Sequence, residues 1–387
     1  MRPPVIIGGG PAGSAAALAL RQAGQPVTLI ERSPGPADKV CADFLGASAI
    51  RIAESAGVSL ASLGARPVTH ARLIRRDAMT ETRLPFRAAA VSRRVFDEAL
   101  LRRCQETGVD LIRGETVRPP RADAEDFAIE TQARGTIATG TLFLATGRPD
   151  PRAITPPISP PGTRSGLHGG PVINPRTGMT GYKMYLRLCP DQRDALAGRV
   201  ELMFLPNGQA ALQCVEADRA ALCLLRRPGP DDDWATILAD TLAGCAHLRR
   251  RLEGSVPLLE RPLVAREIPF GHLHRARVSD HDGLYRLGDQ AAVLSSLIAD
   301  GVSAAMRGGV RAAQAWLSGA GAADYHRRLR GMLWPRTRLV ADYGPSAVPA
   351  TDAAAAAPTA VPGAAPGAAS GTAADSRLAA RWNRLIA

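Results

Sequence analysis

The sequence of 387 residues predicts an α/β fold in which an open parallel sheet carries an inserted antiparallel sheet. Three observations predict this fold. An apolar strand at 5–7 leads through a glycine-rich turn and a helix into a second strand at 27–31. Buried apolar strands follow far downstream, at 141–147 and at 284–289. Between these two strands, residues 180–226 alternate polar and apolar side chains as antiparallel strands do.

The glycine-rich turn reads Gly8-Gly9-Gly10-Pro11-Ala12-Gly13. Gly8 permits a tight turn, Gly10 lets backbone amides approach a pyrophosphate, and Gly13 lets the helix over 14–24 pack closely on the sheet. The helix N-terminus offers free N–H groups and a positive dipole to phosphates. Glu31 ends the second strand, where a carboxylate accepts hydrogen bonds from an adenosine ribose. These positions predict a Rossmann-like βαβ unit that binds a dinucleotide, and the motif alone leaves NAD and FAD open.

The composition excludes several classes of function. Net charge is +12, but the arginines are scattered and no basic block or RNA-binding aromatic motif accompanies them, so we expect no nucleic-acid partner. No run of about 18 apolar residues is present, so we expect no membrane span. Six cysteines form no C-x-x-C pair and lie near no histidine cluster, which predicts reduced thiols, a cytoplasmic location and no metal site.

Only two of the 48 basic residues are lysines, Lys39 and Lys183. Where arginine has replaced lysine almost everywhere, a remaining lysine can mark a place that a planar guanidinium does not fit.

Domain boundaries follow from the order of the predicted elements. The chain leaves the parallel sheet twice and returns to it, so both predicted domains are discontinuous. Residues 346–387 are an Ala/Pro/Gly-rich linker followed by a short basic C-terminal segment, which is either a frayed tail or a contact for lipid or protein. The predicted domains are 1–66, 90–155 and 275–345 for the nucleotide, and 67–89 and 156–274 for the substrate.

Further segments distinguish FAD from NAD. Arg93 opens a helix, Ala145-Thr146-Gly147 ends a buried strand, and Leu287-Gly288-Asp289 precedes a helix that starts at Asp300-Gly301-Val302. With the glycine turn, these segments resemble the FAD-dependent oxidoreductases of the para-hydroxybenzoate hydroxylase fold, over roughly residues 5–340. The resemblance is closest to the geranylgeranyl-reductase-like branch. It implies a glutathione-reductase-type FAD-binding domain with an inserted antiparallel-sheet substrate domain.

The resemblance also implies roles for single residues. Arg32 and Arg93 would lie near the adenosine and the pyrophosphate, and Asp289 would bind the ribityl chain or the phosphates. The helix that starts at Asp300 would stabilise the negative charge of reduced flavin, although Asp300 can also be read as a plain N-cap. The complete set of expected FAD ligands is Gly8, Gly10, Ala12, Gly13, Glu31, Arg32, Arg93, Gly288, Asp289, Asp300, Gly301 and Val302.

Three residues are candidates for catalysis. Lys39 and Cys41 resemble a Lys-x-Cys segment beside the isoalloxazine in the reductase branch, where a nearby lysine favours the reactive thiolate. The alternative for Cys41 is a small buried apolar side chain. Lys183 shares a strand face with Tyr185 and Arg187. It would polarise a carbonyl or phenolate oxygen if that face lines the flavin site, and would otherwise lie on a solvated face.

The reaction type is less well defined by the sequence. The sequence lacks three motifs that mark particular reactions. They are the mid-chain Asp-Gly signature of aromatic hydroxylases, the Trp-x-Trp-x-Ile-Pro motif of flavin halogenases and the aromatic-Trp-Phe-Pro motif of archaeal geranylgeranyl reductases. No second G-x-G-x-x-G exists, so NAD(P)H would visit only transiently as an electron donor.

The sequence therefore predicts an FAD-dependent reductase or monooxygenase that acts on a hydrophobic small molecule of polyketide or isoprenoid type. Two alternatives remain. The tethered basic C-terminal segment suggests a non-catalytic flavin-binding assembly subunit. An NAD-dependent Rossmann dehydrogenase would leave Arg93 and Gly288-Asp289 unexplained.

Overall fold

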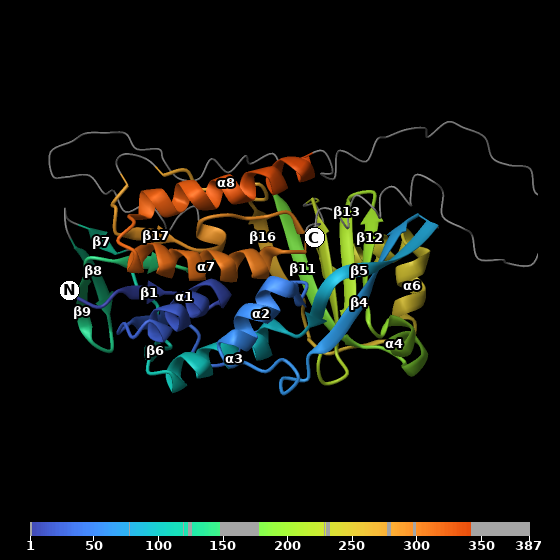
Figure 1. Cartoon of the computed structure of the whole chain (residues 1–387). Coiled ribbons are helices and arrows are strands. Elements are labelled where there is room, and N and C mark those ends of the chain that lie inside the picture. The colour runs from blue at the N-terminus through green and yellow to red at the C-terminus, as the bar shows by residue number, and fades with distance from the viewer. Residues whose placement is uncertain are drawn as a thin grey trace, which may run out of the picture.

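The computed structural model contains two large sheets that lie side by side, with helices around them and a small third sheet, among the described residues (Figure 1). The predicted α/β fold is confirmed. Residues 346–387, predicted as a linker and C-terminal segment, lie outside the described part. The structure describes residues 2–76, 78–118, 120–122, 126–147, 178–227, 229, 233–276, 280–296 and 299–341.

Sheet A is parallel and has the strand order β17-β10-β1-β2-β6. Its strands are short apolar runs, as expected where both faces are covered. Four of them lie where the sequence predicts strands of the parallel sheet. Residues 110–113 are expected from the sequence in a small meander, which is wrong, because they pair in parallel with β2 at the edge of sheet A. The strands are β1 (Val5–Ile7), β2 (Thr28–Glu31), β6 (Asp110–Arg113), β10 (Leu142–Leu144) and β17 (Leu284–Arg286).

Alternate side chains of sheet A enter two different cores. Ile6, Leu29 and Phe143 pack against helices on one face. Val5 and Leu142 face the other way, onto a three-stranded meander. The meander consists of β7 (Arg121–Ala122), β8 (Phe127–Thr131) and β9 (Gly135–Thr139). The helices of this half are α1 (Pro11–Gln22), α2 (Ala47–Ser55), α3 (Arg93–Glu106), α7 (Gly301–Leu317) and α8 (Ala322–Ala341), with a 3-10 turn η2 (Gly288–Gln290).

Sheet B has the strand order β15-β11-β14-β13-β12-β4-β5-β3, and β16 also pairs with β11. All pairs are antiparallel except β12 with β4, which run parallel. This parallel pair joins the hairpin around 66–90 to the strands that follow residue 178. The strands are β3 (Phe44–Leu45), β4 (Arg66–Arg75), β5 (Ala78–Ala90), β11 (Met179–Arg187), β12 (Arg199–Leu205), β13 (Gly208–Cys214), β14 (Ala220–Arg226), β15 (Val256–Pro257) and β16 (Leu263–Ile268).

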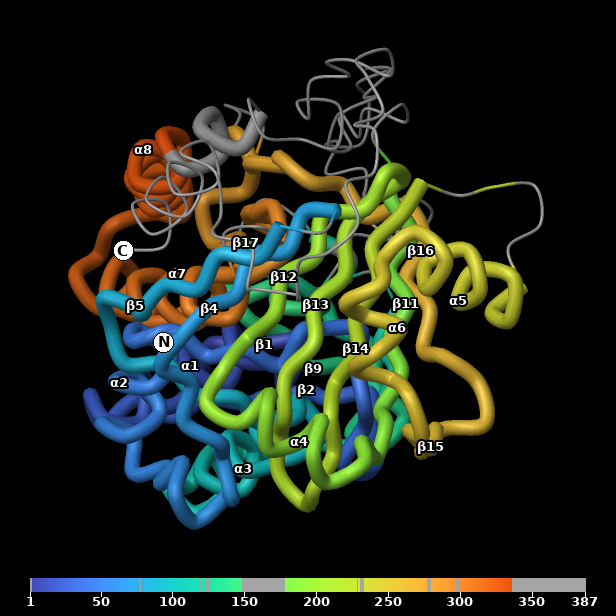
Figure 2. The backbone as a smooth tube through the Cα atoms, turned by 90° about the vertical axis from the view of Figure 1, so that its right-hand side faces the viewer, coloured from blue at the N-terminus to red at the C-terminus, as the bar shows by residue number. Residues whose placement is uncertain are grey.

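The two faces of sheet B have different neighbours. The inner face is turned toward the helices of sheet A, and α5 (Trp234–Ala243) and α6 (Ala246–Leu252) cover the outer face (Figure 2). The sequence predicts one helix over 232–251, which is wrong, because the chain breaks at Gly244 and Cys245 between α5 and α6. A short α4 (Pro190–Leu196) was not predicted. Among the described residues, no helix is long and apolar enough to cross a membrane.

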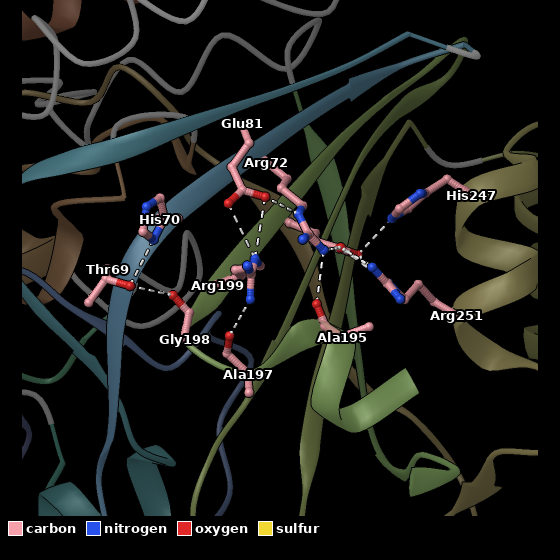
Figure 3. Close-up of polar contacts among 11 residues, drawn as sticks. Thr69, His70, Arg72, Glu81, Ala195, Ala197, Gly198, Arg199, His247 and Arg251 are labelled. Atoms are coloured by element: carbon pink, nitrogen blue, oxygen red, sulfur yellow. Dashed lines mark hydrogen bonds and ion pairs between the residues drawn. The ribbon is translucent and has the colours of Figure 1, made fainter. Parts of the chain in front are cut away.

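A buried carboxylate fixes α6 to the outer face of sheet B. Figure 3 shows His247 and Arg251 of α6 pointing toward the sheet, near Arg72. Glu201 of β12 is 0% exposed and accepts hydrogen bonds from His247 Nε2 at 2.8 Å and Arg251 Nη2 at 2.9 Å, both from α6. Arg72 of β4 adds a third at 3.1 Å. Burial alone would raise the pKa of Glu201, but the hydrogen bonds from His247 and Arg251 outweigh it and lower the pKa to about 2.

We expect Glu201→Gln to lower the free energy of unfolding by about 3 kcal/mol at neutral pH, because it leaves buried cations without their anion. The ionised carboxylate stabilises the fold fully above its ordinary pKa of 4.5, and this stability is lost as the pH falls toward 2. Urea unfolding at pH 7 and pH 4 measures both effects. Glu54→Gln, which removes an exposed pair with Arg87, is the control and should hardly move the urea midpoint. Equal midpoints for both variants would contradict this role of Glu201.

Candidate functional site

The glycine turn between β1 and α1 has no room for side chains at two positions. Gly8 has a φ of +109°, and a Cβ there would lie 2.2 Å from the Ala145 carbonyl oxygen. A Cβ on Gly13 would lie 1.9 Å from the Gly8 carbonyl oxygen. A Cβ on Gly10 would meet only Arg93, at 3.8 Å. The backbone at Gly10 is therefore open, and the first N–H groups of α1 are free to receive a diphosphate.

Glu31 is oriented by the same turn. Its carboxylate, 5% exposed, accepts hydrogen bonds from the backbone N–H groups of Gly9 at 2.6 Å and Ser33 at 2.9 Å. Each carboxylate oxygen keeps a further lone pair, so the group can still accept from ribose hydroxyls. Arg32 follows on the exposed side of the strand end. A cleft beside Glu31 is lined by Gly9, Ser33, Lys39, Asp97 and Arg113, among others.

Arg93 links the turn to α3. Its guanidinium makes two hydrogen bonds to Asp97, at 2.6 and 2.8 Å, and a Cβ on Gly10 would lie nearby. Burial works against the charged form, but Asp97 more than compensates and raises the pKa of Arg93. Lys39 Nζ lies 3.3 Å from the same carboxylate. Arg93 and Lys39 therefore both pair with the Asp97 carboxylate, beside the expected position of the diphosphate.

The turn η2 closes the site from the C-terminal side of sheet A. Gly288 has a φ of +55°, and a Cβ there would lie 3.2 Å from the Cβ of Ala12. Gln290 donates to Thr146 Oγ1 and to the Gly147 carbonyl oxygen, both at 2.9 Å. Asp289 lies between Gly288 and Gln290 in the sequence and is exposed. The sequence did not predict Gln290 as a site residue, although it directly follows the Gly288-Asp289 signature.

Two helix N-termini meet at the other end of the candidate site. α7 begins after Asp300, α2 begins after Gly46, and a Cβ on Gly46 would lie 3.1 Å from Ser303 Oγ. Asp300 is the N-cap residue of α7, as expected, but its carboxylate makes no capping hydrogen bond and instead pairs with Arg307 at 2.6 Å. Gly301 is exposed and Val302 is 8% exposed.

Ser303 supplies a test of whether a ligand fits here. Its hydroxyl is buried, the residue is 1% exposed, and Oγ has no hydrogen-bond partner among the described residues. A buried hydroxyl without a partner is unfavourable, so an acceptor or donor from a bound molecule is expected. The N–H groups of two helix starts and this hydroxyl suit the carbonyl oxygens and ring nitrogens of a flavin pyrimidine.

The three catalytic candidates have different surroundings. Cys41 is half-buried, and the Arg93 guanidinium interacts with its side chain. Lys183 is 0% exposed, so the solvated strand face considered for it is wrong. Its Nζ is bound by Asp43 Oδ2 at 2.5 Å and by the Lys39 carbonyl oxygen at 3.2 Å. The structure thus brings Lys39, Cys41 and Lys183 into one network and leaves their catalytic roles as predictions.

Comparison with known families identifies the cofactor. Residues 3–137 match the family model described as "FAD binding domain". This part of the chain resembles domains that bind FAD, and FAD is the cofactor. The flavoprotein is 25% identical over 334 residues to a protein named menaquinone reductase from Mycolicibacterium smegmatis, covering 83% of this chain and 77% of that protein.

Solved structures show the same fold. The flavin-dependent brominase Bmp2 superposes with a TM-score of 0.67 at 19% identity, covering 88% of the flavoprotein and 85% of the brominase. The myxobacterial chondrochloren halogenase CndH gives 0.70 at 17% identity, covering 88% and 82%. A flavoprotein/dehydrogenase from Cytophaga hutchinsonii gives 0.70 at 17% identity, covering 89% and 86%.

These findings decide between the alternatives that the sequence left open. The cofactor is FAD, so the NAD-dependent dehydrogenase is set aside. The flavoprotein is an FAD-dependent enzyme of the oxidoreductase class, which also sets aside the non-catalytic subunit.

The glycine turn gives a first prediction. Gly13→Ala should abolish retention of FAD, because the new methyl group overlaps the Gly8 carbonyl oxygen and displaces α1. The ratio of flavin to protein absorbance in the purified enzyme measures this. Gly331→Ala on α8 is the matched control, since a Cβ at Gly331 meets no atom within 4 Å. Full flavin content in Gly13→Ala would refute the close approach.

Ser303 gives a second prediction. Ser303→Ala should weaken FAD binding about tenfold, because one hydrogen bond to the cofactor is lost. The thermal stability of the FAD-free protein should not fall, since the hydroxyl has no partner among the described residues. Titration of FAD-free enzyme with FAD and thermal unfolding without FAD give the two numbers. Unchanged affinity for FAD, or a loss of thermal stability in the FAD-free protein alone, would count against a hydrogen bond between Ser303 and FAD.

Proposed function

We propose that this flavoenzyme reduces a carbon–carbon double bond in an apolar small molecule of isoprenoid type. The observation that carries the proposal is the match to a menaquinone reductase over most of both chains. Menaquinone is an isoprenoid quinone. The halogenases share the fold at identities that support the fold alone. Membership of the geranylgeranyl-reductase-like branch is part of this proposal.

The inner face of sheet B supports an apolar substrate. Leu73, Leu202 and Phe204 lie on neighbouring strands in one apolar cluster, with Phe86 packed against it. Gln209 on the same sheet bonds to Ser296, in the segment that follows η2. This face therefore lies beside the segment that leads to α7. We infer that the substrate's apolar part rests on it, where removal from water stabilises binding.

FAD, when bound, supplies hydride transfer at its isoalloxazine ring. The residues of the chain supply binding and charge. Gly10 and the first turn of α1 would bind the diphosphate, and Glu31 the ribose. Ser303 and the starts of α2 and α7 would hold the pyrimidine edge, and the Asp300–Arg307 pair keeps a free carboxylate charge away from it.

Proton transfer is assigned to the loop that carries Cys41. The Cys41 thiol would hold or release a proton at Sγ, and the Arg93 guanidinium lies beside it. Lys39, bound to Asp97, keeps a positive charge near the same place. NAD(P)H is proposed as a transient electron donor. We place the enzyme in the cytoplasm, because all six cysteines are free thiols.

The reaction itself is tested with the FAD-loaded enzyme, reduced by dithionite without oxygen and mixed with menaquinone. We expect reoxidation of the flavin in stopped flow and a product that stays heavier by two hydrogen atoms in mass spectrometry after any quinol has been oxidised back to the quinone. Cys41→Ala should slow this step about 100-fold with unchanged FAD content. Cys189→Ala, which changes a half-buried thiol at the start of α4, is the control and should react normally. An oxygenated or halogenated product, formed only with oxygen, would overturn the proposal.

A further inference from the structure

Hydrogen bonds to main-chain carbonyl oxygens of the loop 39–43 hold this loop on the inner face of sheet B. Three of its carbonyl oxygens accept a hydrogen bond, each from a side chain on a different strand. These bonds are Lys183 Nζ to Lys39 O at 3.2 Å, Cys223 Sγ to Cys41 O at 3.0 Å and Gln213 Nε2 to Ala42 O at 2.5 Å.

The three donors form one patch of the sheet. Lys183 of β11 and Cys223 of β14 stand directly opposite each other in the antiparallel register. Gln213 of β13 lies opposite Ala221, two residues from Cys223 and on the same face. Burial raises the pKa of Cys223 to about 12, so its thiol stays protonated and can donate.

Asp43 fixes the end of the loop. It is 0% exposed with a φ of +61°, an unusual conformation for a residue other than glycine. Its carboxylate accepts from Lys183 Nζ at 2.5 Å, Tyr185 Oη at 2.7 Å and the backbone N–H of Arg93 at 3.2 Å. The loop is thus tied both to sheet B and to the start of α3.

Gln213 shows that this arrangement has an energetic cost. The residue is 1% exposed, and its Oε1 has no hydrogen-bond partner among the described residues. An apolar side chain would avoid that cost. The amide is therefore useful to the protein through the bond that its Nε2 makes to Ala42.

We propose that Lys183, Gln213 and Cys223 are positioning residues, which hold the Cys41 thiol at a defined place beside Arg93. This inference rests on the proposed function, in which Cys41 transfers a proton. Lys183 then acts through the loop, since its Nζ is bound by Asp43 and by Lys39 and it is fully buried. The sheet that receives the substrate also sets the place of the thiol.

The test measures how fast iodoacetamide alkylates Cys41, with and without FAD and without any substrate, by peptide-resolved mass spectrometry. Gln213→Leu and Cys223→Ala should each change the Cys41 rate about tenfold, because a released loop alters access to the thiol and its contact with Arg93. Cys223→Ser keeps a donor and should stay near the wild-type rate. Gln209→Leu, on the same face of β13 but bonded to Ser296, is the matched control for Cys41 reactivity.

Lys183→Met alone leaves the Asp43 carboxylate without its cation and can unfold the protein. This substitution is therefore combined with Asp43→Asn, and the Cys41 alkylation rate of the double variant is compared with that of the wild type. Wild-type alkylation of Cys41 in Gln213→Leu and in Cys223→Ala would overturn the inference. Equal changes in Cys223→Ala and Cys223→Ser would do the same, because packing and not the donor would then matter. Altered alkylation in enzyme that does not reduce menaquinone would sink the proposed function and leave the positioning role standing.

Discussion

The buried carboxylate of Asp43 is the interaction on which the arrangement of this enzyme depends. It joins β11 of sheet B, through Lys183 and Tyr185, to the first backbone N–H of α3. Burial raises the pKa of Asp43 while Lys183 works in the opposite direction, as expected for an ion pair removed from water. Such a pair contributes little net stability, but breaking it is costly. Its value is in fixing one orientation of sheet B against the FAD-binding half.

A second contact reaches the same helix start. Glu216, in the hairpin between β13 and β14, accepts from the backbone N–H of Ser92 at 2.8 Å and from its hydroxyl at 2.6 Å. Ser92 also caps α3 through Val95 N. Both sheet contacts thus end on Ser92 and Arg93, next to the turn at Gly10. A displacement of sheet B would reach the diphosphate site through these two residues.

The sequence predicts four of the five strands of sheet A and the glycine turn, because short-range patterns determine them. It predicts the shared face of Lys183 and Tyr185, and both side chains do reach Asp43. It does not predict Asp43, Gln213 or Glu216, since single polar residues carry no periodic signal and their partners lie more than 100 positions away. The scarcity of lysine did single out Lys183, whose buried site would leave several donors of an arginine unsatisfied.

The meeting of α2 and α7 also has a physical explanation. Two helix N-termini that lie next to each other bring positive dipole ends together, which is unfavourable without an anion or acceptor near them. The nearby carboxylate of Asp300 is paired with Arg307, and the Ser303 hydroxyl has no partner in the described part of the chain. The protein alone therefore leaves this junction incomplete. A bound group rich in hydrogen-bond acceptors would stabilise the two positive helix ends and would also pair with the Ser303 hydroxyl. The cofactor therefore completes the packing of the two helices as well as supplying the chemistry.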